Sequence, residues 1–510
     1  MRVRVKFDMR TSSWRQENWL AQTVESERGF IVALAGLVSM AYSSVLWSTY
    51  GYFDDYILLG WAKSNNTSIL RFTATYGRPV SGLIQELLLS LTTSVGGLRW
   101  VRLVGMLGTV LFSVAIYLSM RRFEASKWWS LLAAILSATS PALAIYTAWA
   151  ITAPAPWFLA VAVASYFGVE VARTRRASGA TWRAHLVWPV VGMSLVALGS
   201  QATTLAYLLP IAISVLFENP SLAELWRRGR FHLLALAPVA LMAAIVFRLG
   251  TTLATEANDR TSFVRDPGEK AVWFVRGALA RSFDQVHLMS RPRTSVAIAA
   301  CIAFGLLVGP AREFWRRITS IGLAILCLPL GYLPNLITAE NWSSARTLPV
   351  VMTLVSLMTV RAFQNVKRHW MLLTVPIVSV ALLLGALQWY RAATNVYRDM
   401  VVPQELEYRA LRVAIHKAVA NNPARLVVYP ASWSDGLSNE ISFDEFGIPS
   451  LEHPNYVIGF VRLMQIRHEI EWSGELLVST ADRPIPILSE DAVVDVGAEL
   501  RSLRDSLGRF

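Results

Sequence analysis

The stretch FIVALAGLVSMAYSSVLWSTYGYFDD, residues 30–55, has about twenty residues without a charge and then two adjacent carboxylates, Asp54 and Asp55. A helix of about twenty apolar residues crosses the ~30 Å hydrocarbon core of a bilayer. The stretch therefore predicts a membrane span with the acidic pair at its end. Carboxylates at the C-terminus of a helix oppose its dipole, so this placement does not stabilise the helix and needs another reason.

The composition extends this prediction to the whole chain. Of its 510 residues, 54% are hydrophobic and 16% are charged, whereas a soluble domain carries about 25% charged residues. We predict an α-helical polytopic membrane protein. About eleven runs have the length and apolarity of transmembrane helices: 30–49, 101–120, 129–150, 154–172, 186–200, 203–217, 231–249, 295–308, 318–337, 348–360 and 371–390.

Basic residues predict the orientation. The net charge is +13, and its Arg and Lys residues cluster in alternate connections, which is typical of cytoplasmic loops rather than of a nucleic-acid surface. Residues 1–29 are then cytoplasmic, and the protein is expected in a bacterial inner (cell) membrane. The segments 50–100, 250–293 and 338–347 and the tail from residue 391 fall on the outer side.

The tail has a different pattern from the rest of the chain. A helix over 404–420, a strand over 425–429, an amphipathic helix over 455–470 and a strand over 475–479 alternate along it. This alternation predicts a small α/β domain. The expected organisation is therefore a cytoplasmic segment 1–29, a transmembrane domain 30–390 and an extracytoplasmic domain 391–510.

Two outer segments carry polar residues with possible chemistry. In 50–100, a turn at Gly77-Arg78-Pro79 precedes a helix over 80–91, which is too short to span and is expected at the interface. In 338–347, Arg346 is placed where its guanidinium can hold a phosphate by paired hydrogen bonds. The outer segment 250–293 is rich in arginine, against the usual charge bias of outer loops, and an anionic ligand is one explanation for this.

The order of these features resembles the GT-C class of membrane glycosyltransferases, and more narrowly the bacterial O-antigen glucosyltransferases of lipopolysaccharide biosynthesis. Short motifs carry the resemblance: Asp54-Asp55, then Gly77-Arg78-Pro79, then Ser344-Ala345-Arg346-Thr347 before a span, and Glu445-Phe446-Gly447 in the tail. The resemblance implies a GT-C-like domain with interfacial helices in its first outer loop. It also implies a donor sugar carried on a polyprenyl phosphate.

An inverting sugar transfer needs a base for the acceptor hydroxyl and positive charge for the departing phosphate. The resemblance implies that Asp54 or Asp55 is the base, with Asp54 preferred. Either could also hold a divalent cation such as Mg²⁺ or Mn²⁺, if one is used. The other expected site residues are of two kinds: Arg346, Arg78, Arg71 and Arg281 for the donor phosphate, and Tyr76, Glu86, Glu340, Asp444 and Glu445 for the substrates.

The expected activity is thus the transfer of a hexose such as glucose to a cell-surface glycan or lipid-linked acceptor. Three alternatives stay open at this point. A polysaccharide polymerase or ligase would use the same class of substrate. A flippase for lipid-linked sugars would line its path with charges inside the spans, and few are found there apart from span ends. A structural membrane protein would not need the acidic pair.

Overall fold

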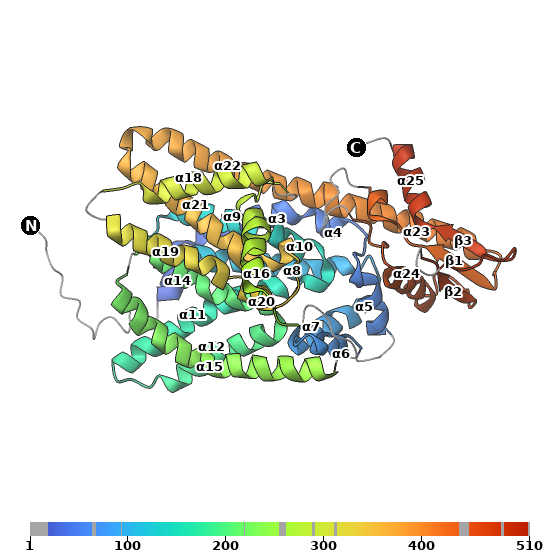
Figure 1. Ribbon diagram of the computed structural model, residues 1–510, viewed down its shortest axis with the longest axis horizontal. Coiled ribbons are helices and arrows are strands. Elements are labelled where there is room, and N and C mark those ends of the chain that lie inside the picture. The colour runs from blue at the N-terminus through green and yellow to red at the C-terminus, as the bar shows by residue number, and fades with distance from the viewer. Residues whose placement is uncertain are drawn as a thin grey trace, which may run out of the picture.

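The computed structural model describes residues 19–63, 68–92, 94–218, 220–253, 262–287, 291–310, 314–437, 448–480 and 484–507. Long helices lie side by side along the longest axis and form a bundle (Figure 1). The strands, with α24 and α25, lie at one end of this bundle, and α14 and α19 lie towards the other end (Figure 1). We call residues 402–437, 448–480 and 484–507 the C-terminal unit.

Among the described residues, the regular elements of the first half of the chain are all helices. Its α-helices are as follows: α2 (Trp19–Ser26), α3 (Arg28–Tyr42), α4 (Ser44–Trp47), α5 (Asp54–Lys63), α6 (Ser68–Thr75), α7 (Pro79–Ser90), α8 (Leu98–Arg122), α9 (Lys127–Ala138), α10 (Pro141–Ala148), α11 (Ala155–Ala177), α12 (Arg183–Gly199), α13 (Gln201–Thr204), α14 (Leu209–Phe217) and α15 (Leu222–Leu253). Single turns η1 (Ala150–Thr152) and η2 (Leu205–Leu208) connect some of them.

The second half adds the segment from α16 to α17, the last helices of the bundle and the C-terminal unit. Its helices are as follows: α16 (Pro267–Trp273), η3 (Phe274–Leu279), α17 (Ala280–Phe283), α18 (Pro292–Leu307), α19 (Phe314–Leu330), α20 (Leu333–Ile337), η5 (Ala345–Thr347), α21 (Pro349–His369), η6 (Met371–Leu373), α22 (Thr374–Asn395), η7 (Val396–Val401), α23 (Val402–Val419), η8 (Trp433–Asp435), α24 (Pro454–Ile466) and α25 (Val496–Leu507).

Five helices of the described chain are long and apolar enough to cross a membrane: Leu98–Arg122, Ala150–Ala177, Leu222–Gly250, Pro349–His369 and Met371–Val419. A sixth span is possible if α9 and α10, which are bent by 58° at Pro141, count as one. Four of the other expected runs correspond to apolar helices of 10–17 residues. This is a membrane protein, and the expected number of about eleven spans stays a prediction.

Exposed leucines agree with a lipid environment. On α15, Leu233, Leu234 and Leu241 are each more than 60% exposed, and on α22 Leu383 is 67% exposed. An aqueous surface rarely presents such large apolar patches. By contrast, two thirds of the apolar window of α21 is buried inside the bundle. Hence α15 and α22 face the lipid and α21 is central.

The C-terminal unit contains a three-stranded parallel sheet in the order β2-β1-β3. Its strands are β1 (Arg425–Tyr429), β2 (Glu475–Val478) and β3 (Ala492–Asp495). Parallel strands need crossover connections, and α24 lies in the connection between β1 and β2. The two strands and two helices expected in the tail are present, while β3 and α25 were not foreseen.

Helix α5 shares its core with the C-terminal unit rather than with the centre of the bundle. Tyr56 and Leu59 of α5 are buried in one apolar cluster with Phe460 of α24 and Leu426 of β1. The rings of Tyr56 and Phe460 meet edge to face at 5.1 Å. Burial of such large side chains stabilises the contact by roughly 2 kcal/mol each. The acidic pair at the start of α5 is therefore held between bundle and C-terminal unit.

Candidate active site

Asp54 and Asp55 form the first turn of α5, not the end of the preceding helix. The expectation of a C-terminal position is therefore wrong. Helix α4, which follows α3, ends at Trp47, and Phe53 then adopts a left-handed backbone with φ 42°, which a non-glycine residue rarely does. A new helix starts at this point. Negative charge is favoured at a helix N-terminus, so the dipole now stabilises the pair.

Asp55 is completely buried, and both of its oxygens accept backbone hydrogen bonds. Tyr52 N donates to Oδ2 at 3.0 Å and Ile151 N donates to Oδ1 at 3.2 Å. Burial raises the pKa of Asp55 to about 7, and the nearby positive charge of Arg102 opposes this rise. Asp55 thus ties the acidic turn to η1, the single turn before α11.

Arg102 of α8 is a fully buried cation beside this turn. Its guanidinium lies 3.5 Å from the centre of the Tyr50 ring, and its Nη2 donates to the Tyr50 carbonyl. The Tyr50 hydroxyl in turn donates to the carbonyl of Ala148 at 2.9 Å. A buried charge is costly unless it is paired. The charge of Arg102 acts on Asp55, while Nε and Nη1 of Arg102 are buried without a hydrogen-bond partner among the described residues.

Asp54 is only partly buried and has different partners. Its negative charge acts on the hydroxyl of Tyr456, which α24 contributes from the C-terminal unit. Burial raises the pKa of the Tyr456 hydroxyl, as does the negative charge of Asp54, while the charge of Arg346 lowers it. Asp54, Tyr456 and Arg346 therefore lie within electrostatic reach of one another.

Arg346 lies in the turn η5, over a platform of aromatic side chains. Its guanidinium is 5.0 Å from the ring centre of Trp149 and 5.9 Å from that of Trp342. The Trp149 ring also contacts Tyr52 edge to face at 5.3 Å and Phe53 at 5.8 Å. Trp149 therefore contacts both the acidic turn, through Tyr52 and Phe53, and the guanidinium of Arg346. Asp54 and Arg346 are almost three hundred residues apart in the sequence.

The segment 262–287, which contains Arg281, holds the loop before Arg346. Lys270 Nζ donates to the Glu340 carbonyl at 2.6 Å and to Asn341 Oδ1 at 3.0 Å. Arg281 Nη1 donates to the carbonyl of Ser343 at 3.1 Å. These contacts show that Arg281 and Glu340 help to hold this loop in place. Both residues were expected to contact substrate. Their expected roles towards substrate stay predictions.

The expected residues between α5 and α8 form other groups. Gln201 of α13 accepts from Arg78 Nε at 3.2 Å and donates to the Tyr76 carbonyl at 3.1 Å, on either side of the left-handed Gly77. Glu86 accepts from the N–H of Leu70 at 3.3 Å, in the first turn of α6, and Arg71 is exposed beside it. The remaining two expected residues, Asp444 and Glu445, lie outside the described residues.

The structure tests the predicted metal site only through the side chains that could bind a metal ion. The described residues contain no group of three or more His, Cys, Asp or Glu side chains that could hold a metal ion. Mg²⁺ sites often use one or two carboxylates together with substrate phosphates. Of the acidic pair, Asp55 already accepts backbone hydrogen bonds on both oxygens. A divalent cation stays a prediction.

Three residues of this cluster were not expected from the sequence. Arg102 stands at the start of an apolar run, and a charge there was a usable signal. Trp149 ends another run, where tryptophan is ordinary at a membrane interface. Tyr456 is one tyrosine on an amphipathic helix, and no local pattern distinguishes it.

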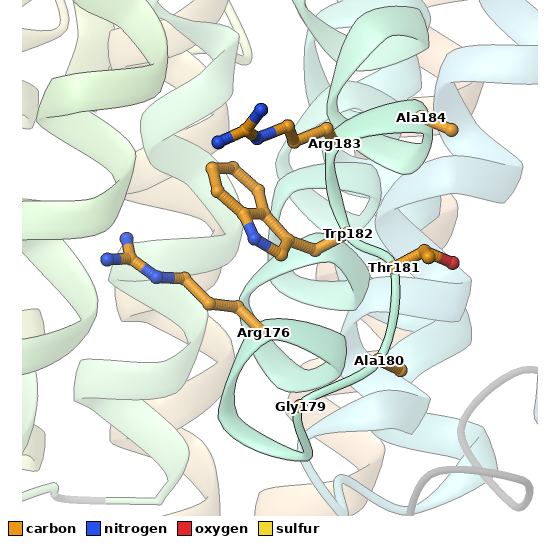
Figure 2. A pocket seen from close by; sticks show the side chains of 7 residues that line it. All are labelled: Arg176, Gly179, Ala180, Thr181, Trp182, Arg183 and Ala184. Atoms are coloured by element: carbon orange, nitrogen blue, oxygen red, sulfur yellow. The ribbon is translucent and has the colours of Figure 1, made fainter.

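A separate hollow lies between α11 and α12 and is lined by residues 179–184 with Arg176 (Figure 2). The guanidinium groups of Arg176 and Arg183 flank the indole of Trp182, at 5.2 Å and 5.9 Å from its ring centre. This end of α12 lies far from the C-terminal unit (Figure 1). The hollow is therefore not part of the site at Asp54.

Comparisons with known proteins give only distant similarity. No protein-family model matches the chain, and no curated protein matches it. Among solved structures, it is similar to the archaeal oligosaccharyltransferase AglB from Archaeoglobus fulgidus in complex with an inhibitory peptide and a dolichol-phosphate. The TM-score is 0.45 with 14% sequence identity, over 83% of this chain and 63% of that chain.

The apo form of the Archaeoglobus fulgidus oligosaccharyltransferase is similar to the same degree, with a TM-score of 0.45 and 14% identity. There the match covers 80% of this chain and 63% of the other. The chain thus spans less than two thirds of the length of that protein. Similarity at this level establishes neither a shared fold nor a shared activity.

Proposed function

We propose that this membrane protein is an inverting glycosyltransferase of the GT-C type that takes its sugar from a polyprenyl-phosphate donor. The observation that carries the proposal is that Phe53, directly before Asp54, and the guanidinium of Arg346 both lie against the ring of Trp149. A carboxylate and a guanidinium in one cluster are the two groups that sugar transfer from a phosphate requires.

The proposed step divides the acidic pair into two roles. Asp54, which is partly exposed, takes the proton from the acceptor hydroxyl as that oxygen attacks the anomeric carbon. The bond between this carbon and the phosphate oxygen breaks, and the polyprenyl phosphate leaves with the electron pair. Asp55 is buried with both oxygens occupied, so it fixes the turn and does not meet the acceptor.

Arg346 stabilises the charge that develops on the departing phosphate. Its guanidinium stacks on Trp149 and Trp342, which orients a planar group with several donors. The other arginines expected at the phosphate (Arg78, Arg71 and Arg281) are retained as secondary candidates. A donor of this kind has its lipid in the bilayer and its sugar at the surface, which suits short helices such as α6 and α7 beside the spans.

The finer assignments belong to the same proposal. They are a hexose such as glucose as the sugar, a cell-surface glycan or lipid-linked acceptor, and a site on the outer face of a bacterial inner membrane. The substrate roles of Tyr76, Glu86, Glu340, Asp444 and Glu445 also remain part of it. A polymerase or ligase would use the same cluster with a different acceptor.

The test is sugar transfer or donor hydrolysis by the purified protein in lipid, with a panel of polyprenyl-phosphate sugars and with and without a chelator. We expect Asp54→Asn to lower the rate by about 10² or more while donor binding is kept. Glu224→Gln, at a carboxylate of α15 that pairs with Arg228, is a control outside the candidate site and should keep most of the rate. Full activity of Asp54→Asn would remove Asp54 from the chemistry. Movement of the donor across the bilayer without turnover would indicate a flippase.

A further inference from the structure

The hollow between α11 and α12 has the size and the charge of a site for a small anionic group. Its volume is about 390 Å³, within the range of ~300–1,000 Å³ that is usual for small-molecule sites. Two arginines, Arg176 and Arg183, line it, and no carboxylate does. Both guanidinium groups extend to the same side of the turn, with the indole of Trp182 between them (Figure 2). The hollow therefore presents two positive charges around a flat apolar ring.

Arg176 and Arg183 have aromatic neighbours rather than acidic partners among the described residues. By contrast, Arg173, three residues before Arg176 on α11, pairs with Glu170 at 2.7 Å. A guanidinium that lies over a ring is oriented by it and keeps the N–H donors at its edge for an anion. The charge in the hollow is therefore suited to binding an external anion.

The hollow lies at the membrane boundary of two neighbouring helices. Arg176 is the residue before the last of the candidate span Ala150–Ala177. Trp182 packs edge to face on Phe231 of α15, with ring centres 5.9 Å apart, and α15 belongs to the candidate span Leu222–Gly250. Tryptophan and arginine at the end of a span are typical of the level of the lipid headgroups. The anionic groups at this level of a bilayer are lipid phosphates.

An exposed apolar stripe runs along α12 away from the hollow. Val187, Trp188, Val191 and Leu195 are all exposed, and their spacing places them on one face of the helix. Arg183, four residues before Val187, begins the same face. From Arg183 to Leu195 the helix rises by about 18 Å, which is close to half of the ~30 Å hydrocarbon core. This face therefore offers a cation for a headgroup and an apolar surface as long as one leaflet.

We propose that the hollow and the stripe together bind one anionic phospholipid. Arg176 and Arg183 donate charge-assisted hydrogen bonds to its phosphate, and an acyl chain lies along Val187, Trp188 and Val191. Basic pockets between membrane helices bind anionic headgroups in this way. The proposal does not depend on the proposed sugar transfer, because the hollow is separate from the site at Asp54.

The experiment titrates the purified protein in detergent with phosphatidylglycerol or phosphatidylcholine, and native mass spectrometry measures the affinity of the most tightly bound lipid. We expect phosphatidylglycerol to bind at least about tenfold more weakly to Arg176→Gln/Arg183→Gln than to wild type, because charge-assisted hydrogen bonds are lost. Phosphatidylcholine, whose ammonium offsets the charge of its phosphate, should distinguish the two proteins much less. Equal affinity of both proteins for phosphatidylglycerol would overturn the proposal.

A charge-matched variant controls for the net charge of the protein. Arg316→Gln/Arg368→Gln also removes two exposed arginines, neither of which lines the hollow. This variant should keep the affinity of wild type for phosphatidylglycerol. The same loss in both double variants would show that the lipid responds to net charge rather than to the hollow, which would also overturn the proposal.

A third variant separates a lipid from a free phosphate ion. Trp188→Ala shortens the exposed stripe without touching the arginines, so it should weaken the binding of phosphatidylglycerol. Inorganic phosphate, added as a competitor, should not displace the lipid from wild type, because it makes no contact with the stripe. Displacement by phosphate, together with full lipid affinity in Trp188→Ala, would indicate a site for a soluble phosphate and contradict the lipid assignment.

Discussion

The backbone N–H of Ile151 donates to Oδ1 of Asp55 at 3.2 Å, across 96 positions of the chain. The carbonyl of the same residue accepts from Gln85 of α7 at 2.7 Å. Ile151 lies in η1, at the start of the candidate span Ala150–Ala177. One residue of the bundle therefore positions both the acidic turn and the short helix α7, which gives the site a rigid base.

Replacing Asp55 should mainly affect stability. Asp55→Leu leaves the N–H groups of Tyr52 and Ile151 without their acceptor in a buried place and leaves Arg102 without its facing carboxylate. We expect a loss of about 3 kcal/mol or more in the free energy of unfolding. Thermal unfolding in detergent measures it. Asp54→Leu, at a partly exposed neighbour, should cost much less, and equal losses would show that the burial of Asp55 does not matter.

The buried charges of Asp55 and Arg102 should depend on each other. Arg102→Met leaves the Asp55 carboxylate buried without a facing cation, so this variant should also be destabilised by about 3 kcal/mol. In the double variant Asp55→Leu/Arg102→Met neither charge is left alone. The double loss should then be smaller than the sum of the single losses by about 1–3 kcal/mol. Additive losses in this double-mutant cycle would contradict an interaction between the two residues.

Stability should fall with rising pH through the titration of Asp55. The pKa is raised from 3.8 to about 7 in the folded protein, so the folded state binds this proton more tightly than the unfolded state. The contribution of this proton to the free energy of unfolding is complete below about pH 4. It is lost progressively up to about pH 7, with a slope of at most about 1.4 kcal/mol per pH unit.

Unfolding measured between these pH values, in wild type and in Asp55→Asn, isolates this contribution because the other groups titrate in both proteins. The wild type should show the additional downward slope and Asp55→Asn should lack it. Parallel curves for the two proteins would mean that Asp55 is ionised throughout this range.

Arg346 should be sensitive to replacement by lysine. Lysine keeps the charge but loses the planar donor fork and the stacking on Trp149. We expect Arg346→Lys to lower kcat/KM for the polyprenyl-phosphate donor by about 10- to 100-fold. Arg99→Lys is the matched control, because the exposed Arg99 also stacks on an indole, that of Trp100 at 5.2 Å. Similar losses in both variants would point to packing rather than to phosphate binding.

Local pattern was sufficient for the elements themselves. The apolar runs predict helices because about twenty apolar residues have few other ways to be buried, and the expected runs fall largely on helix. Strands in the tail, such as β1, were predictable for a similar reason, since a strand that is buried on both faces is continuously apolar. The short helix that starts at Pro79 was likewise predictable, because proline is favoured in the first turn.

The sequence by itself determined which segments are apolar, which are helical or extended, and that the acidic pair and Arg346 are placed where charge is unusual. Only the tertiary structure decided that Asp55 is buried and Asp54 is not, because burial depends on residues such as Ile151 and Arg102 that are remote in the chain. Because the backbone of Phe53 is left-handed, a new helix begins after it, and the acidic pair lies at the start of this helix rather than at the end of the preceding one. The approach of Tyr456 depends on α24 packing on α5 at Gly459, a contact between distant segments that no local periodicity records.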